Sequence, residues 1–188
     1  MYLKNNKGLT LVELLITIAI LGILMAAISA FIFPTMSFFA KSQNTANAKN
    51  AANLIMDYIE GSVYSTDEIT LQQLSSPGIT PEKYYLLTAN EINGILLYTN
   101  ATGLSLPVFR NGITEGLRFT ITFSKAQDQV LHIDIVVKSR QNSEELYGLE
   151  KDIYLANLLT APNDKIHEES ASGPYPEIKF TKPTGTTP

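Results

Sequence analysis

The sequence predicts an α+β protein in which a long N-terminal helix packs against an antiparallel β-sheet head. Three observations support this prediction. The segment Leu14–Phe33 is a run of 20 mostly apolar residues, an amphipathic segment follows it at 41–61, and alternating apolar and polar residues mark strands further on. We therefore expect a head at 62–161 and a proline-rich tail at 162–188.

The composition of the 188 residues excludes several classes of protein. An apolar content of 45% is enough for a hydrophobic core. The net charge of −4 and the absence of any basic block argue against direct nucleic-acid binding, which depends on clustered Lys and Arg. The chain has no cysteine, so it has no disulfide, no thiolate nucleophile and no zinc site built on sulfur.

The apolar run LLITIAILGILMAAISAFIF has the length of a membrane-spanning helix, since about 20 residues cross a hydrocarbon core. Lys4 and Lys7 precede it without any acidic residue between them, and a long polar region follows. Because positive flanks stay in the cytoplasm, we expect the N-terminus inside and the head outside. The membrane-spanning half of the helix is placed at 9–40.

Glu13 stands at the start of this run, where a carboxylate is costly and is a functional hypothesis by default. A secretory signal peptide would explain the small residues of AAISA at 26–30, but the run is longer than the usual apolar region of such peptides. A plain uncleaved anchor explains the hydrophobicity and the orientation. It leaves Glu13 without a purpose.

The stretch KGLTLVEL, from Lys7 to Leu14, resembles the processing signal of type IV prepilins and type II secretion prepseudopilins. The resemblance implies a leader at 1–8, cleavage between Gly8 and Leu9 by a prepilin peptidase, and N-methylation of Leu9 by the same enzyme. Glu13 is then the fifth residue of the mature chain. One departure is that the family favours Phe at the first mature position, where this chain has Leu9.

The same resemblance gives Glu13 a role in assembly. In the family's proposed arrangement this carboxylate meets the N-terminal amine of a neighbouring subunit, and a single charge pair fixes axial register where apolar helix faces alone do not. Gly8 keeps the backbone at the cleavage site permissive, with no bulk beside the bond to be cut. Lys4 and Lys7 supply the leader charge.

In the outer half of the helix, apolar residues recur at steps of three and four, which is the pattern of an amphipathic helix. They are Ala48, Ala51, Ala52, Ile55 and Ile59. Gly61 is the predicted stop. Gly22 and Pro34 are candidate hinge positions: Gly22 matches a glycine usual in pilins, but their usual proline position is Ala30 here. A simple kink at Pro34 and a functional hinge both stay open.

The head is expected to contain strands at 94–100, 117–123 and 130–138, with a partner strand in LYGLEKDIYLANL at 146–158 and a loop at 75–84. The apolar face of these strands must be buried, and the apolar face of the helix at 41–61 is the element available to pack on it. A helix laid on an antiparallel sheet is also the pilin head architecture. The tail has five prolines in 27 residues, so we expect no helix or central strand there, with PYPEIKF extended along the head.

Candidate chemistry in the head is sparse. His132 and Asp134 share one strand face and would suit a metal ion or acid–base catalysis, but a solvated strand face is the favoured interpretation. The other histidine, His167, lies in the tail. Acidic pairs lack the spacing of a calcium loop; they are Asp67 with Glu68, Glu144 with Glu145, and Glu168 with Glu169. We expect no catalytic residue, no cofactor and no metal.

Together these features predict a structural subunit, a minor one, of a type IV pilus or a type II secretion-like pseudopilus. Its partners would be prepilin peptidase, other pilin or pseudopilin subunits and, indirectly, the assembly platform and its ATPase. It would reside in the cytoplasmic membrane and then in a cell-surface filament. The head features are similar to those of minor pilins and J-type minor pseudopilins. The alternative is an uncleaved, single-pass anchored binding module or adhesin.

Overall fold

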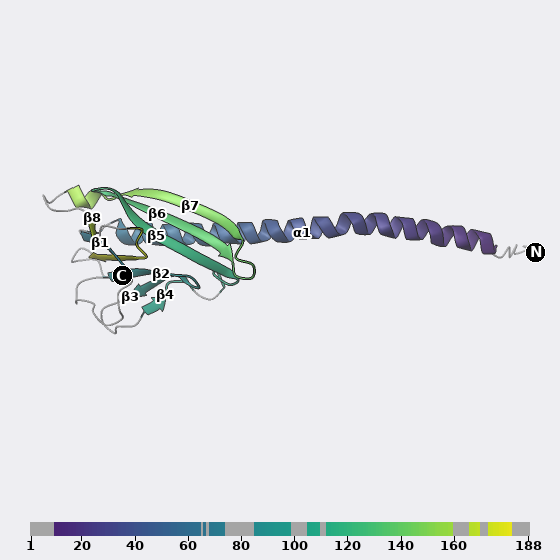
Figure 1. Cartoon of the computed structure of the whole chain (residues 1–188), viewed down its shortest axis with the longest axis horizontal. Helices are drawn as coiled ribbons and strands as arrows, with labels where there is room; N and C mark the ends of the chain where they lie inside the picture. The colour runs from purple at the N-terminus through teal and green to yellow at the C-terminus, as the bar shows by residue number, and fades with distance from the viewer. Residues whose placement is uncertain are drawn as a thin grey trace, which may run out of the picture. The chain divides into compact units, whose positions relative to one another are not determined.

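The computed structural model describes residues 10–64, 66, 68–73, 85–98, 105–109, 112–159, 166–169 and 173–181. The chain forms two compact units, Met1–Gln43 and Asn44–Pro188. One helix, α1 (Leu11–Val63), supplies the described part of the first unit from Leu11 onward and is the first element of the second (Figure 1). The two units are treated separately below.

Helix α1 continues through Pro34 and through the predicted stop at Gly61, and it ends at Val63. Val63 is fully buried in the head core, and so is Ile59 one turn earlier. Packing of these two side chains holds the last turn helical despite the low helix propensity of glycine. The helix end is therefore set by tertiary contacts that local sequence does not display.

Gly61 is exposed, and a Cβ built on it would meet no atom within 4 Å. We expect Gly61→Ala to stabilise the head by about 0.5–1 kcal/mol, because alanine loses less backbone freedom in a helix than glycine does. Urea unfolding monitored by circular dichroism measures the change. A decrease in stability would mean that α1 does not keep its helical conformation at this position.

The described residues of the head form two sheets (Figure 1). A three-stranded antiparallel sheet has the order β5-β6-β7, formed by Leu117–Gln127, Val130–Ser139 and Glu145–Tyr154. A six-stranded sheet has the order β4-β3-β2-β9-β1-β8, formed by Ser105–Pro107, Gly94–Tyr98, Tyr85–Asn90, Glu177–Thr181, Glu68–Gln72 and Ile166–Glu168. A short 3-10 helix, Ala156–Leu159, follows β7.

The core confirms the predicted apolar faces. The inward residues of β5 and β6 are all buried: Leu117, Phe119, Ile121, Phe123, Leu131, Ile133, Ile135 and Val137. The helix stripe that was expected to cover them is also buried, at Ala48, Ala51, Ala52, Ile55 and Ile59. These side chains belong to one hydrophobic cluster. A helix packed on β-sheets is thus the observed architecture.

Two expectations about the sheet need correction. The six-stranded sheet is mixed, because β8 runs parallel to β1 while every other pair is antiparallel. The tail supplies both β8 and β9, and β9 is a central strand. The prediction that no central strand lies in the tail was therefore wrong. The five prolines that motivated it all lie outside β9, so each residue of this strand keeps its backbone N–H; they are Pro162, Pro174, Pro176, Pro183 and Pro188.

Tyr58 of α1 is half-buried, and its ring packs edge-on against Phe109 with 5.9 Å between centroids. Burial raises the pKa of Tyr58 above its ordinary value of 10.0, and a hydrogen bond with Ser62 acts in the opposite direction to a smaller extent. Because the folded state favours the neutral phenol, the stability present below pH 10 is lost as the pH rises through the raised pKa.

We therefore expect Tyr58→Phe to flatten the loss of stability above about pH 10, because the variant keeps the ring contact and removes the titrating group. Urea midpoints measured from pH 8 to above pH 10 for both proteins provide the test. Parallel curves for the two proteins would show that Tyr58 does not contribute to alkaline destabilisation.

Candidate functional site at the start of the helix

The first turn of α1 is held by a reciprocal set of hydrogen bonds between Thr10 and Glu13. The backbone N–H and the hydroxyl of Thr10 both donate to Glu13 Oε2, each over 2.9 Å, and the Glu13 N–H donates to Thr10 Oγ1 over 3.3 Å. Leu14 N–H donates to the Thr10 carbonyl over 3.2 Å, which is the first helical bond. This is a capping box, with Thr10 as N-cap and Glu13 three residues later.

The sequence analysis singled out Glu13 but did not predict the capping role of Thr10. The signal was present: Thr-x-x-Glu immediately before an apolar run is the pattern of a capping box. The structure thus places Glu13 on the first turn with its carboxylate directed back toward the helix N-terminus. The other predicted processing residues, Lys4, Lys7, Gly8 and Leu9, lie outside the described residues, so their geometry is not placed.

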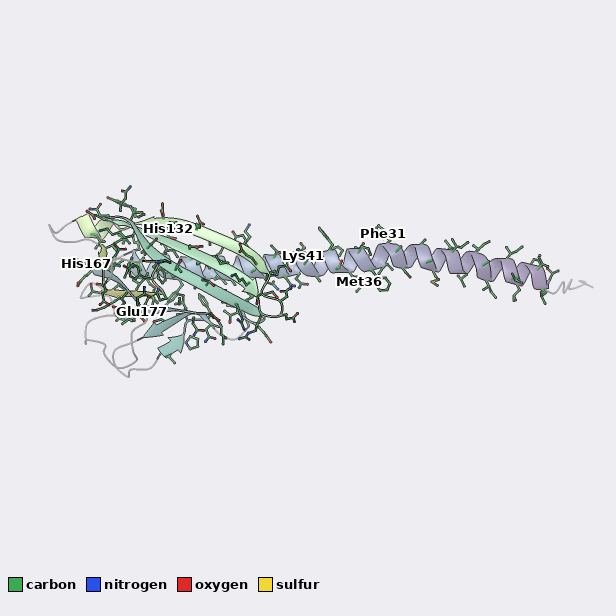
Figure 2. All side chains as sticks on the ribbon, in the orientation of Figure 1. Phe31, Met36, Lys41, His132, His167 and Glu177 are labelled. Atoms are coloured by element: carbon green, nitrogen blue, oxygen red, sulfur yellow. The ribbon has the colours of Figure 1, made fainter. Side chains whose placement is uncertain are left out.

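Beyond Glu13, α1 is the one helix among the described residues that is long and apolar enough to cross a membrane. No residue of its most apolar stretch is buried within the protein. Phe31 and Met36 project outward from the helix, and the next charged residue after Glu13 is Lys41 (Figure 2). An apolar surface exposed on every side of a helix requires lipid or other protein as its surroundings.

The hydroxyl groups within this apolar stretch bond to the backbone of their own helix. Thr17 Oγ1 donates to the Glu13 carbonyl over 2.7 Å, and Ser29 Oγ and Thr35 Oγ1 donate to carbonyls four residues earlier over 2.8 Å. Ser37 Oγ donates to the Pro34 carbonyl over 2.8 Å. Each of these groups is satisfied without water, as a membrane-spanning segment requires.

The candidate hinge residues lie inside this continuous helix. Pro34 is within α1, and a Cβ on Gly22 would meet no atom within 4 Å. Pro34 has no N–H, so the bond to the carbonyl four residues earlier is missing. A hinge at Gly22 or Pro34 stays a prediction.

In the head, the candidate pair of His132 and Asp134 is not the pair that forms. His132 lies directly opposite Asp152 in the β6–β7 ladder, and its Nδ1 is 2.6 Å from Asp152 Oδ1. Asp134 lies opposite Glu150. A cross-strand partner brings side chains closer than a residue two positions along one strand, which explains the difference. Sequence periodicity shows the shared face but not the partner strand's register.

No group of three or more histidine, aspartate and glutamate side chains in the described part of the chain has the arrangement of a metal site. The acidic residues Glu68, Glu145, Glu168 and Glu169 are exposed, and Asn142 donates to Glu144 over 3.2 Å. Asp67 lies outside the described residues. His167, in β8, is exposed as well and pairs with Thr70 of β1.

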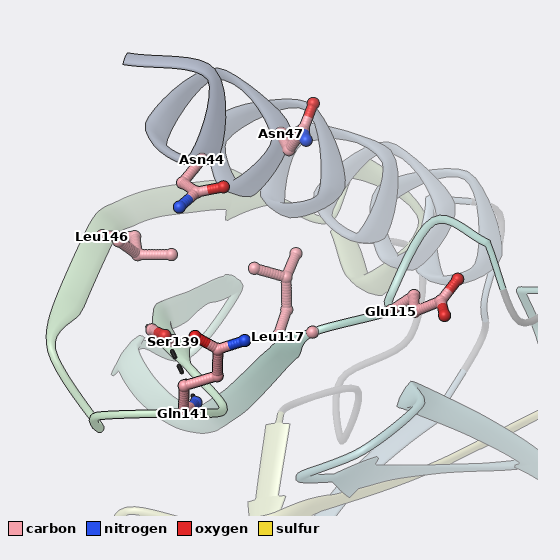
Figure 3. A pocket seen from close by; sticks show the side chains of 8 residues that line it. Asn44, Asn47, Glu115, Leu117, Ser139, Gln141 and Leu146 are labelled. Atoms are coloured by element: carbon pink, nitrogen blue, oxygen red, sulfur yellow. Dashed lines mark hydrogen bonds between the residues drawn. The ribbon is translucent and has the colours of Figure 1, made fainter. Parts of the chain in front are cut away.

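Two hollows adjoin the head part of α1. One, of about 140 Å³, is lined by Asn44, Asn47, Glu115, Gly116, Leu117, Ser139, Gln141 and Leu146 (Figure 3). The other, of about 240 Å³, is lined by Asn47, Asn50, Ala51, Leu54, Gly112, Ile113, Glu115 and Leu117. Their linings bring together carboxamides, the Ser139 hydroxyl and the Glu115 carboxylate.

The comparison with protein families matches residues 3–29 to the prokaryotic N-terminal methylation motif. This match contains all of the predicted processing residues and the capping box. No curated protein sequence matches the chain.

The solved structures provide a match to the fold. A single-residue mutant of the PilB minor pilin from Streptococcus sanguinis superposes with a TM-score of 0.53 at 14% identity, over 75% of this chain and 36% of that one. A second structure of the same minor pilin has a TM-score of 0.49 at 8% identity, over 79% and 36% of the two chains. The present chain thus aligns with about a third of the length of those proteins.

A long apolar helix that continues into an α+β head defines a pilin-like fold. The chain combines this fold with a match to the prokaryotic N-terminal methylation motif over residues 3–29.

Proposed function

We propose that this protein is a minor structural subunit of a type IV pilus or a type II secretion-like pseudopilus. A prepilin peptidase cleaves it between Gly8 and Leu9 and methylates the new amine of Leu9. The subunit resides in the cytoplasmic membrane with its head outside. It assembles into a filament by packing the exposed apolar surface of α1 against other subunits. Other pilin or pseudopilin subunits are its direct partners, and an assembly platform with its ATPase acts indirectly. It is a building block, without catalysis of its own.

The observation that carries the proposal is the continuity of three features in one segment. The methylation motif covers residues 3–29, the capping box places Glu13 in the first helical turn, and the helix that follows exposes apolar side chains on every side. A plain anchor needs only the last of these. The pilin-like head supports the same conclusion at the level of the fold.

The geometry of Glu13 suits a contact with a neighbouring subunit's amine. Both hydrogen bonds from Thr10 reach Oε2, and none of the described residues donates to Oε1. An ionised carboxylate has about four acceptor positions. Glu13 can therefore cap its own helix through one oxygen and accept the cationic amine of a neighbour through the other.

The mature N-terminus decides whether processing occurs. Mass spectrometry of the protein purified from cells with active prepilin peptidase should give a chain that begins with N-methylated Leu9. In cells that lack the peptidase, the chain should begin at Met1. An intact Met1 in both strains would contradict the proposal and support the alternative, an uncleaved anchored binding module or adhesin.

A further inference from the structure

The segment Gly173–Thr181 pairs with β1, β2 and β5, and these three strands form no hydrogen-bonded ladder with one another. Strand β9 lies between β1 and β2 and is antiparallel to both. Just before it, Tyr175 exchanges two backbone hydrogen bonds of 2.8 Å with Phe123 of β5, in the other sheet. Without this segment, the described part of the six-stranded sheet divides into β8-β1 and β2-β3-β4.

The side chains of the segment fill the core from this position. Tyr175 and Ile178 are fully buried and Phe180 is nearly so. The ring of Phe180 stacks on Tyr85 of β2 with 5.7 Å between centroids. The segment therefore contributes both backbone bonds and large apolar side chains, as the peptide does in strand-addition complexes.

Glu177 fixes which residues of β9 lie opposite which residues of its neighbours. Its side chain is 2% exposed, and its two oxygens accept hydrogen bonds from two different strands. Gln72 of β1 donates to Oε1, and Thr88 of β2 donates to Oε2 over 2.7 Å. A slip of two residues would place Lys179 at this buried position and remove the carboxylate that accepts from Gln72 and Thr88, so Glu177 favours one register.

The partners that close this arrangement are far apart along the chain. Glu177 is 105 residues from Gln72 and 89 residues from Thr88. Contacts of such long separation form late, because loop closure must precede any gain from them. Both flanking strands, β1 and β2, precede the segment in the sequence, so they are synthesised before β9 and pair with it afterwards.

We propose that β1, β2 and the Phe123 region of β5 form a strand-binding site for an extended peptide with the sequence of residues 173–181. The chain's own residues 173–181 supply that peptide, and a separate peptide of the same sequence binds in its place. The head is then completed only when residues 173–181 have left the membrane. This timing rests on the proposed export of the head, whereas the binding site itself does not.

The test uses the full chain in detergent with a specific protease site inserted between Glu169 and Gly173. After cleavage, a fluorescently labelled peptide of residues 173–181 is added in excess at low urea, and its binding is measured by fluorescence anisotropy. We expect saturable binding with displacement of the original fragment. A Glu177→Ala peptide should bind about tenfold more weakly or worse, because it removes the buried carboxylate that accepts from Gln72 and Thr88.

A Lys179→Arg peptide is the matched control and should bind like the unchanged peptide, since it keeps a cation on the same strand and face. Equal binding of a scrambled peptide, or a cleaved head that keeps its urea midpoint after the fragment is removed, would overturn the proposal. Hydrogen exchange of the uncut chain gives an independent reading. Amides of β9, β1 and β2 should open together before those of β5, β6 and β7, and equal protection of all these strands would overturn it.

These experiments need neither prepilin peptidase nor a filament. A chain that binds the peptide but is never processed would leave the strand-binding site intact and remove the proposed function. A processed chain that binds no peptide would leave the proposed function intact and remove the strand-binding site.

Discussion

Replacing Glu13 with Val should reduce incorporation into filaments about tenfold or more, while the amount of protein in the membrane stays unchanged. The variant keeps the apolar character of the helix and removes the one charge that can pair with a neighbour's amine. Shear fractions of cells, probed for this subunit and normalised to its membrane level, measure the effect. An anchored binding module would show no change in either fraction.

The physical reason is that the apolar part of α1 has no other charge that could fix its axial position. From Leu14 to Ala40 the segment is uncharged, and its hydroxyl groups bond to their own helix. Sliding one such helix along another therefore changes their interaction energy little. A carboxylate that meets a cationic amine in a membrane-like interior has a single favourable position. Leaving either charge without its partner there is strongly unfavourable.

Thr17→Val is the matched control. It removes a hydroxyl one turn later on the same helix, and that hydroxyl bonds only to the Glu13 carbonyl among the described residues. The valine side chain has nearly the same shape. We expect normal incorporation of the Thr17 variant, whereas equal losses for both variants would show that polarity in this part of the helix matters, rather than the charge of Glu13.

The sequence predicted those parts of the fold whose signal is local. Alternation within β5 and β6 identifies their inward faces because side chains alternate across any strand, and steps of three and four identify the buried stripe of α1 for the same reason. The capping box of Thr10 and Glu13 is equally local, so the pattern was available although it was overlooked.

The parts that were missed depend on partners distant in the chain. Nothing within PYPEIKF shows that β9 will lie between β1 and β2, since the bonds of Glu177 reach across 105 and 89 residues. The partner of His132 is likewise fixed by the β6–β7 register and not by its own strand. The helix end at Val63 follows from burial in a core that the helix sequence alone does not describe.

Gly94→Ala should destabilise the head by about 2–4 kcal/mol, the largest effect that we expect from a single methyl group in this protein. Gly94 begins β3 with φ of +76°, after a turn in which Asn90 Oδ1 accepts the N–H groups of Ile92 and Asn93 over 3.0 and 2.9 Å. L-residues with a Cβ are strained in this left-handed region. Urea unfolding gives the change in free energy.

Strain accounts for only part of the loss, because the site is also crowded. A Cβ on Gly94 would lie 2.6 Å from Ile55 Cδ1 and 3.3 Å from Ile55 Cγ1. Ile55 is a fully buried residue of α1, so it cannot swing into solvent to make room. The added methyl group would therefore push the helix and the β2–β3 turn apart, at the point where α1 covers the sheet.

Gly116 separates the two effects. It has the same φ of +76°, yet a Cβ there would meet nothing within 4 Å. Gly116→Ala should therefore cost only the backbone strain, about 1–2 kcal/mol. In the Gly94 variant, adding Ile55→Val removes the Cδ1 atom and should restore part of the stability, although Ile55→Val alone destabilises by about 0.5–1.5 kcal/mol. Strictly additive effects of the two changes would show that α1 does not contact the turn at Gly94.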